Sequence, residues 1–163
     1  MEKNLKETLN TRKIPLWSEL PELDLYMDQV IVLMEKHLNV SKKDKLITPS
    51  MINNYVKLGI VPPPQKKKYS KTHIAYLIII CSLKQVMPIP DIKILIDEKL
   101  KNSSIEELLN EYSKLYSECT QKILTLSETY ETEEKSNPAM FLAVSASVCR
   151  SSSEDFLNKI KPS

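Results

Sequence analysis

Glycine is almost absent from this chain of 163 residues, in which Gly59 is the only one. Phosphate-cradling loops and dinucleotide-binding motifs need several glycines at fixed spacing, and tight hairpins usually contain one. The sequence therefore argues against most nucleotide-dependent enzymes and against glycine-dependent hairpins. Because Leu, Ile, Lys and Glu are abundant and favour helices, we predict an all-α protein.

Cysteine is also scarce. Cys81, Cys119 and Cys149 are odd in number, widely spaced and set in apolar stretches, so they suggest neither a disulfide framework nor a zinc site. We expect them to be small core residues. The N-terminus has no apolar secretory segment, and the uncharged apolar run 74–83 is too short to span a bilayer. We therefore expect a cytoplasmic protein without a membrane partner.

Catalytic groups do not cluster in the sequence. His37 and His73 have no neighbours at metal-ligand spacing, and the acidic residues are spread along predicted helix faces. Structural or surface roles are the better interpretation for both histidines. We predict that the protein is not an enzyme and needs no cofactor or metal, because no nucleophile, base and oxyanion donors can be assembled.

Charge is unevenly distributed along the chain, although the net charge is only +2. The segment 41–73 contains eight lysines and one acidic residue, Asp44, whereas the segment 91–135 contains eleven acidic residues and six lysines. One part of the molecule is therefore suited to meet an anion.

Apolar periodicity divides the chain into three regions. Residues 1–20 are predicted to form an N-terminal arm in which Trp17 packs onto the body. Residues 21–100 are predicted to form a DNA-binding domain, and residues 101–163 a helical dimerisation or effector region. Helices are predicted over 21–38, 49–58, 71–86, 91–100, 105–130 and 138–149, with a loop over 39–47 and a last short helix from a capping box at 151–154.

The segment 48–70 combines a short helix with a lysine-rich turn. Thr48 and Pro49 are a strong helix start, and Gly59 supplies the left-handed residue that ends a helix. The prolines 62–64 force extended backbone before the three lysines 66–68. A buried helix follows, so the segment has the parts of a winged helix-turn-helix.

A short helix with polar outward residues can enter the major groove and reach base edges, while lysines neutralise phosphates. The predicted DNA-contacting residues are Thr48, Ser50, Asn53, Asn54, Lys57, Lys66, Lys67, Lys68 and Tyr69. The lysines could instead form a solvated loop and the asparagines an ordinary surface. We favour nucleic acid because the lysines follow the capped helix directly.

The same segment resembles the MerR family of bacterial regulators. The matching residues are Thr48-Pro49, Ile52, Tyr55, Gly59-Ile60-Val61, Pro63, Tyr69-Ser70, Ile74 and Asp91-Ile92. The resemblance implies a winged helix-turn-helix that binds double-stranded DNA, followed by a long dimerisation helix. Two departures are Asn53, where the family commonly has arginine, and a wing with lysines in place of a Tyr-Arg pair.

The chain as a whole resembles the bacterial group known as domain of unknown function 1836. The resemblance is carried by WSELPELDLYMDQV, ITPSMINNYVKLGIVPPPQKKKYS and HIAYLIIICSLKQV. It implies a predicted regulator and supplies neither an operator nor a small-molecule effector.

Two functional hypotheses follow. The first is a sequence-specific transcriptional regulator that dimerises through residues 105–149 and so pairs two half-sites. The second is a protein-interaction adaptor that keeps a degenerate helix-turn-helix as a scaffold, which Asn53 supports. The apolar segment 139–149 could line a ligand pocket or a dimer interface, or it could simply cover the long helix of its own chain.

Overall fold

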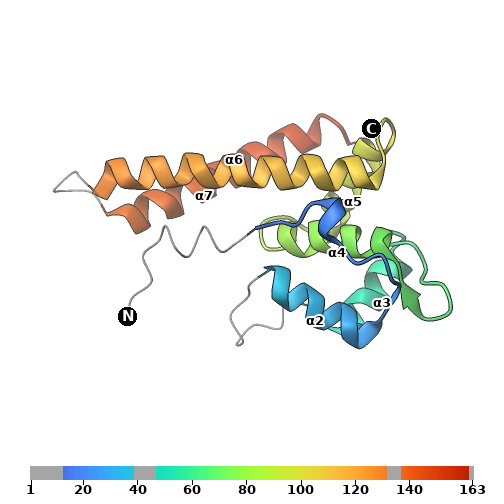
Figure 1. Ribbon diagram of the computed structural model, residues 1–163. Helices are drawn as coiled ribbons and strands as arrows, with labels where there is room; N and C mark the ends of the chain where they lie inside the picture. Colours follow the sequence, from blue (N-terminus) through green and yellow to red (C-terminus); the bar gives the residue numbers. More distant parts are fainter. Residues whose placement is uncertain (1–12, 39–46, 132–136, 162–163) are drawn as a thin grey trace.

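The structure is a computed structural model that describes residues 13–38, 47–131 and 137–161 (Figure 1). It is mostly helical, as predicted, with one small two-stranded sheet. The elements are η1 (Trp17–Glu19), β1 (Leu25–Tyr26), α2 (Met27–Leu38), α3 (Pro49–Lys57), β2 (Lys68–Tyr69), α4 (Lys71–Leu83), α5 (Ile89–Leu100), α6 (Ile105–Glu131) and α7 (Pro138–Asn158).

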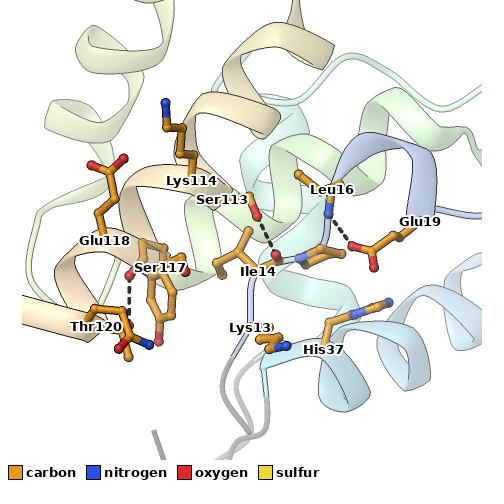
Figure 2. A pocket seen from close by; sticks show the side chains of 13 residues that line it. Lys13, Ile14, Leu16, Glu19, His37, Ser113, Lys114, Ser117, Glu118 and Thr120 are labelled. Atoms are coloured by element: carbon orange, nitrogen blue, oxygen red, sulfur yellow. Dashed lines mark hydrogen bonds between the residues drawn. The ribbon is translucent and has the colours of Figure 1, made fainter. Parts of the chain in front are cut away.

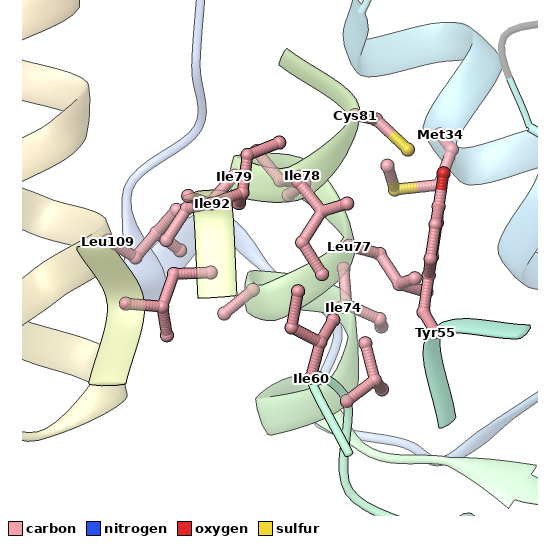
Figure 3. Close-up of a cluster of buried hydrophobic side chains, with 14 of the residues drawn as sticks. Met34, Tyr55, Ile60, Ile74, Leu77, Ile78, Ile79, Cys81, Ile92 and Leu109 are labelled. Carbon is pink, nitrogen blue, oxygen red and sulfur yellow. The ribbon is translucent and has the colours of Figure 1, made fainter. Parts of the chain in front are cut away.

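Helix α4 is the centre of the core. It is apolar on nearly all sides and is packed by α2, α5 and α6, as its continuous run of isoleucines and leucines predicts. Leu77 and Ile78 are completely buried. Figure 3 shows Met34 and Tyr55 on one side of α4 and Ile92 and Leu109 on the other, so α4 joins the two halves of the molecule.

Helix α3 begins and ends where the sequence predicts. The Oγ1 atom of Thr48 accepts a hydrogen bond from the backbone N–H of Met51 at 3.3 Å, and Pro49 occupies the first turn. Gly59 has a φ of +64°, which favours glycine because other residues lose energy there. These local signals confirm the predicted helix start and stop.

Helix α2 starts at Met27, so the predicted helix start at Pro21 is wrong. Leu25 and Tyr26 form β1, which pairs antiparallel with β2, with Leu25 opposite Tyr69. The backbone N–H of Tyr26 then donates to Oε1 of Gln29 at 2.9 Å, which satisfies a free amide at the start of the helix. The strand partner comes from far along the chain, so local periodicity could not reveal it.

The prolines are followed by a hairpin turn made without glycine, a kind of hairpin to which the expectation about glycine-dependent hairpins does not apply. Lys68 N–H donates to the Gln65 carbonyl at 2.8 Å, and Gln65 N–H donates to the Lys68 carbonyl at 3.2 Å. Lys66 and Lys67 have φ values of 48° and 63°. Two successive positive φ values define a type I′ turn. We call Gln65–Lys68 the lysine turn.

The N-terminal residues Lys13–Leu20 form a strap across α6. Trp17 N–H donates to Oδ1 of Asn110 at 2.9 Å, and the Ser113 hydroxyl donates to the carbonyl of Ile14 at 2.7 Å. The prediction that Trp17 packs onto the body is confirmed. The rest of the predicted arm, residues 1–12, and the loop 39–46 lie outside the described residues.

Helices α6 and α7 form an antiparallel pair (Figure 1). Ser104 and Glu107 make a capping box at the start of α6, with hydrogen bonds of 3.2 and 2.7 Å. Helix α7 runs unbroken through Ser151, so the predicted separate last helix is wrong. The Arg150–Glu154 ion pair at 3.1 Å spans that point and supports the continuous helix.

The cysteine prediction is correct for one residue of three. Cys81 is completely buried in α4, whereas Cys119 on α6 and Cys149 on α7 are exposed. Both exposed cysteines lie on the helix pair, where one helix covers only one face of the other. No helix within the described residues is long and apolar enough to cross a membrane.

Candidate nucleic-acid interface

Helix α3 has one buried face and one polar face. Ile52 is completely buried and Tyr55 is 3% exposed, so this stripe anchors the helix to the core. Ser50, Asn53, Asn54 and Lys57 are exposed on the other side and line a shallow hollow of about 570 Å³, to which Ile89 of α5 also contributes. The structure therefore brings together four of the predicted contact residues.

The lysine turn adjoins the first turn of α3. Lys67 and Pro49 line the same hollow of about 590 Å³, together with Tyr26, Met27, Asp28 and Ile31. Lys66 and Lys67 are exposed. Asp28 is the acidic residue on this hollow, and it makes no ion pair with Lys67. The outward ends of these lysines are therefore open to an anion.

Lys68 and Tyr69 are placed differently from their two predecessors. The Nζ atom of Lys68 lies 5.1 Å from the ring centroid of Tyr26, a cation–π distance, and the side chain is half-buried. Tyr69 is 3% exposed and belongs to the core. We therefore correct the assignment of Tyr69 from a contact residue to a supporting residue.

His73 fastens the lysine turn to α4. The backbone N–H of Ser70 donates to Nδ1 of His73 at 3.0 Å, so the ring proton is placed on Nε2. Nε2 then donates to the carbonyl of Pro63 at 3.3 Å. The Tyr69 ring meets the imidazole edge to face, with centroids 5.6 Å apart. His73 thus caps α4 and is hydrogen-bonded to Pro63 and Ser70, the two ends of the segment 63–70 that contains the lysine turn.

Lys93 on α5 holds the other end of α3. Its Nζ donates to the carbonyl of Gly59 at 3.1 Å and pairs with Oδ2 of Asp97 at 2.8 Å. A cation near the C-terminal end of a helix also complements the helix dipole. Neither Lys93 nor Tyr26 lies in the segment 48–70, so the sequence pattern did not indicate their roles. The spacing Ser70-x-x-His73, which mimics a capping box, could have indicated the role of His73.

Some lysines of this region are already paired within the protein, whereas others remain available to bind an anion. Lys71 forms an ion pair with Glu22 and lies 5.1 Å from the Trp17 ring centroid, so it holds the strap in place. Lys57, Lys66 and Lys67 form no ion pair with any residue that the structure describes. Burial raises the pKa of Tyr55, on the inward face of α3, to about 12, so its hydroxyl stays neutral in the core.

These features define a mostly helical protein in which a lysine-tipped turn adjoins the first turn of a short capped helix. Residues 15–119 match the family described as Domain of unknown function (DUF1836), and the chain belongs to that family. The match includes the strap from Pro15 onward, α3, the lysine turn, α4, α5 and the first half of α6. No curated protein and no solved structure matches the chain.

Proposed function

We propose that the protein is a sequence-specific transcriptional regulator that binds double-stranded DNA through a MerR-like winged helix-turn-helix. One observation carries the proposal: the exposed tip of the lysine turn lines a hollow with Pro49, the residue that directly precedes Ser50 at the start of the polar face of α3. Helix α2 and α3 form the helix-turn-helix in this proposal, and the lysine turn is the wing. The assignment of a winged helix-turn-helix rests on the position of the lysine turn next to the start of α3 and on the MerR resemblance of the segment 48–74.

Helix α3 is the proposed recognition helix. The major groove admits one α-helix, and α3 is anchored by Ile52 and Tyr55 with its polar side outward. An asparagine amide can both donate to and accept from adenine, so Asn53 and Asn54 are the proposed base-reading residues. Lys57 is one of the proposed phosphate contacts, and Thr48 positions the helix start through its cap.

The lysine turn is proposed to grip the adjacent phosphate backbone. Each phosphate neutralised by a lysine releases a condensed counterion, so the logarithm of the binding constant falls with the logarithm of salt concentration by about 0.9 per contact. Lys57, Lys66 and Lys67 would together contribute a slope of about 2.7 on this basis. Lys68 contributes less because its ammonium group faces the Tyr26 ring.

Fluorescence anisotropy with duplex DNA at several salt concentrations tests the proposal. The variant Lys66→Glu/Lys67→Glu reverses both charges at exposed positions and is expected to abolish binding. Lys122→Glu on α6 is the matched control, because Lys122 is also exposed but lies outside the proposed interface. Absence of binding at low salt, or undiminished binding by the double variant, would refute the proposal.

Sequence specificity is tested separately by selecting preferred duplexes from a random pool. We expect Asn53→Ala to relax the preference at one base position and to cost about 1–3 kcal/mol on the preferred site. Lys57→Ala is expected to weaken the binding of all DNA sequences alike. If Asn53→Ala and Lys57→Ala have the same effect on every duplex, α3 does not read bases.

A homodimer through α7 is part of the proposal. The segment 138–149 has no charged residue, and its exposed fractions are 64% at Met140, 55% at Val144 and 59% at Val148. The other face of α7 packs on α6, so the segment covers its own chain and still leaves an apolar stripe exposed. Spacing of four residues places the three side chains on one face.

The stripe is self-complementary. A two-fold axis through Val144 would lay Met140 of one antiparallel helix on Val148 of a second copy, and the reverse. Such a symmetric patch suits an isologous interface, and the lack of charge removes repulsion between the copies. Two copies would then present two α3 helices to two half-sites of a palindromic operator.

Sedimentation equilibrium tests the dimer. Val144→Lys puts two charges next to the proposed axis and is expected to yield a monomer. Ala146→Lys is the control, because it lies about 200° further around the same helix and is also exposed. Equal dissociation constants for the two variants would show that the stripe is not the interface.

The exposed stripe on α7 also favours the alternative function, a protein-interaction adaptor. In that case the stripe would hold a different protein, and the helix-turn-helix would act as a scaffold without DNA binding. Recovery of a stoichiometric partner that Val144→Lys releases, together with DNA binding that is absent at low salt, would favour the adaptor over the regulator.

A further inference from the structure

A cavity of about 560 Å³ lies between the strap, the C-terminal end of α2 and the middle of α6 (Figure 2). Its walls come from Lys13–Leu16 and Glu19, from His37 on α2, and from residues 113–121 of α6. This volume is in the usual range for small-molecule sites, which are about 300–1,000 Å³. Neither the proposed DNA interface nor the α7 stripe uses any of these residues.

The wall formed by the strap is apolar, and most of its polar groups are already engaged. Ile14, Pro15 and Leu16 line it. The Glu19 carboxylate accepts a hydrogen bond from the Leu16 N–H at 2.7 Å, and the Ser113 hydroxyl donates one to the carbonyl of Ile14. An apolar body fits against this wall without leaving buried polar groups unsatisfied.

Two donors remain at one end of the cavity. Lys13 and His37 form no ion pair with any residue in the described part of the chain. Figure 2 draws both on the same side of the cavity, with Glu19 beside His37, whereas Lys114 and Glu118 extend away from them and carry opposite charges. Lys13 and His37 therefore offer hydrogen-bond donors at that end, where Lys13 is the cation and the Glu19 carboxylate already accepts the Leu16 N–H.

We propose that this cavity binds a small amphipathic carboxylate, with its apolar part against the strap and its carboxylate beside Lys13 and His37. A carboxylate accepts hydrogen bonds from an ammonium and an imidazole N–H, and such charge-assisted bonds are stronger than neutral ones. Tyr116 also lines the cavity, and its ring adds apolar area for the ligand body.

The location couples the ligand to the rest of the molecule. Helix α2 packs on α3 and on β1, and the strap is hydrogen-bonded to α6. A ligand that bridges α2, the strap and α6 would stabilise one arrangement of these three elements over others. An effect on DNA affinity rests on the proposed function, whereas ligand binding itself does not.

Histidine side-chain NMR tests the site, because the chain contains only two histidines, His37 and His73. Burial, followed by the charge of Lys36, lowers the pKa of His37, with Glu19 acting in the opposite direction. A carboxylate placed beside the ring would favour the protonated imidazole and shift its Cε1–H signal. His73 is an internal control because it caps α4 and does not line the cavity.

The probes are benzoate, phenylacetate and octanoate, with benzamide, phenylacetamide and octanamide as uncharged counterparts. We expect a saturable shift of the His37 signal with at least one acid, at least tenfold weaker binding of the matching amide, and no shift of His73. His37→Gln identifies the signal. No response to any of the three acids at millimolar concentration, or equal shifts of both histidines, would overturn the proposal.

Two variants test the placement. Ser117→Trp fills the cavity from an exposed position on α6 and should abolish the shift of the His37 signal. Lys13→Met removes a positive charge and should weaken the binding of the acids but not of the amides. Lys122→Met on the same helix is the control and should bind normally. A full response in Ser117→Trp, with native thermal stability, would also overturn the proposal.

The anisotropy assay with saturating probe separates this inference from the proposed function. A changed DNA affinity supports the coupling, and an unchanged affinity in a protein that binds the probe overturns the coupling alone. Absence of DNA binding without any probe is a failure of the proposed function, and the NMR result is then judged by itself.

Discussion

Replacing the two lysines at the tip of the lysine turn should raise stability while it lowers DNA affinity. Lys66 and Lys67 have φ values of 48° and 63°, a region that costs an ordinary residue about 1–2 kcal/mol. The variant Lys66→Asn/Lys67→Gly installs the pair that type I′ turns prefer. These two residues therefore hold an unfavourable backbone conformation at the position proposed to contact phosphate.

The gain in stability is smaller than the full relief of strain. Glycine also increases the conformational entropy of the unfolded chain, which removes about 0.5–1 kcal/mol, and asparagine relieves only part of the cost. A net increase of about 1 kcal/mol in the free energy of unfolding is expected. For a chain of this length that corresponds to a rise of about 2–4 °C in Tm.

The loss of affinity follows from two missing phosphate contacts. At about 1 kcal/mol per contact, DNA binding should weaken about thirtyfold, and the salt slope should fall by about 1.8. The control Lys66→Arg/Lys67→Arg keeps both the charges and the backbone cost, so neither Tm nor affinity should change appreciably.

Thermal unfolding and fluorescence anisotropy on the same preparations measure the two effects. A variant that is less stable than the native protein would refute the type I′ assignment. A variant that is more stable but binds DNA as tightly, with the native salt slope, would refute the proposed contact by the lysine turn.

Three further predictions concern the core and its supports. His73→Ala should lower the free energy of unfolding by about 1–3 kcal/mol in denaturant titration, because the Ser70 cap and the proline-segment contact are lost together; an unchanged midpoint would contradict this role. Iodoacetamide at pH 8 should label Cys119 and Cys149 in the native protein and Cys81 only after denaturation, as counted by mass spectrometry, because burial raises the pKa of the Cys81 thiol to about 12. The same pKa, raised from an ordinary value of 9.0, means that the free energy of unfolding should decrease as pH rises from about 9 towards 12, with a shallower decrease in Cys81→Ala; identical curves would exclude this contribution.

The elements with strong local signals were predicted from the sequence. Thr48-Pro49 and Gly59 bound α3 because a cap and a left-handed residue act within a few positions of the chain. The burial of α4 followed from its nearly continuous apolar side chains. The outward polar face of α3 followed from the spacing of Ser50, Asn53 and Lys57.

The elements that depend on distant partners were not predicted. Leu25 and Tyr26 have the apolar pattern of the helix that follows, yet they pair with Lys68 and Tyr69 because the strand hydrogen bonds are available only in the folded chain. Tyr69 was assigned to the surface, but its ring packs on His73. Their positions depend on contacts across the fold, which no local pattern encodes.

The sequence by itself determined the helical character of the protein, the limits of α3, the buried centre at α4 and the concentration of lysines in the segment 41–73. Tertiary structure decided which lysines remain available, how the lysine turn meets the start of α3, and where a cavity forms under the strap. The physical reason is distance along the chain: caps and helix periodicity act over three or four residues, whereas these contacts join residues tens of positions apart.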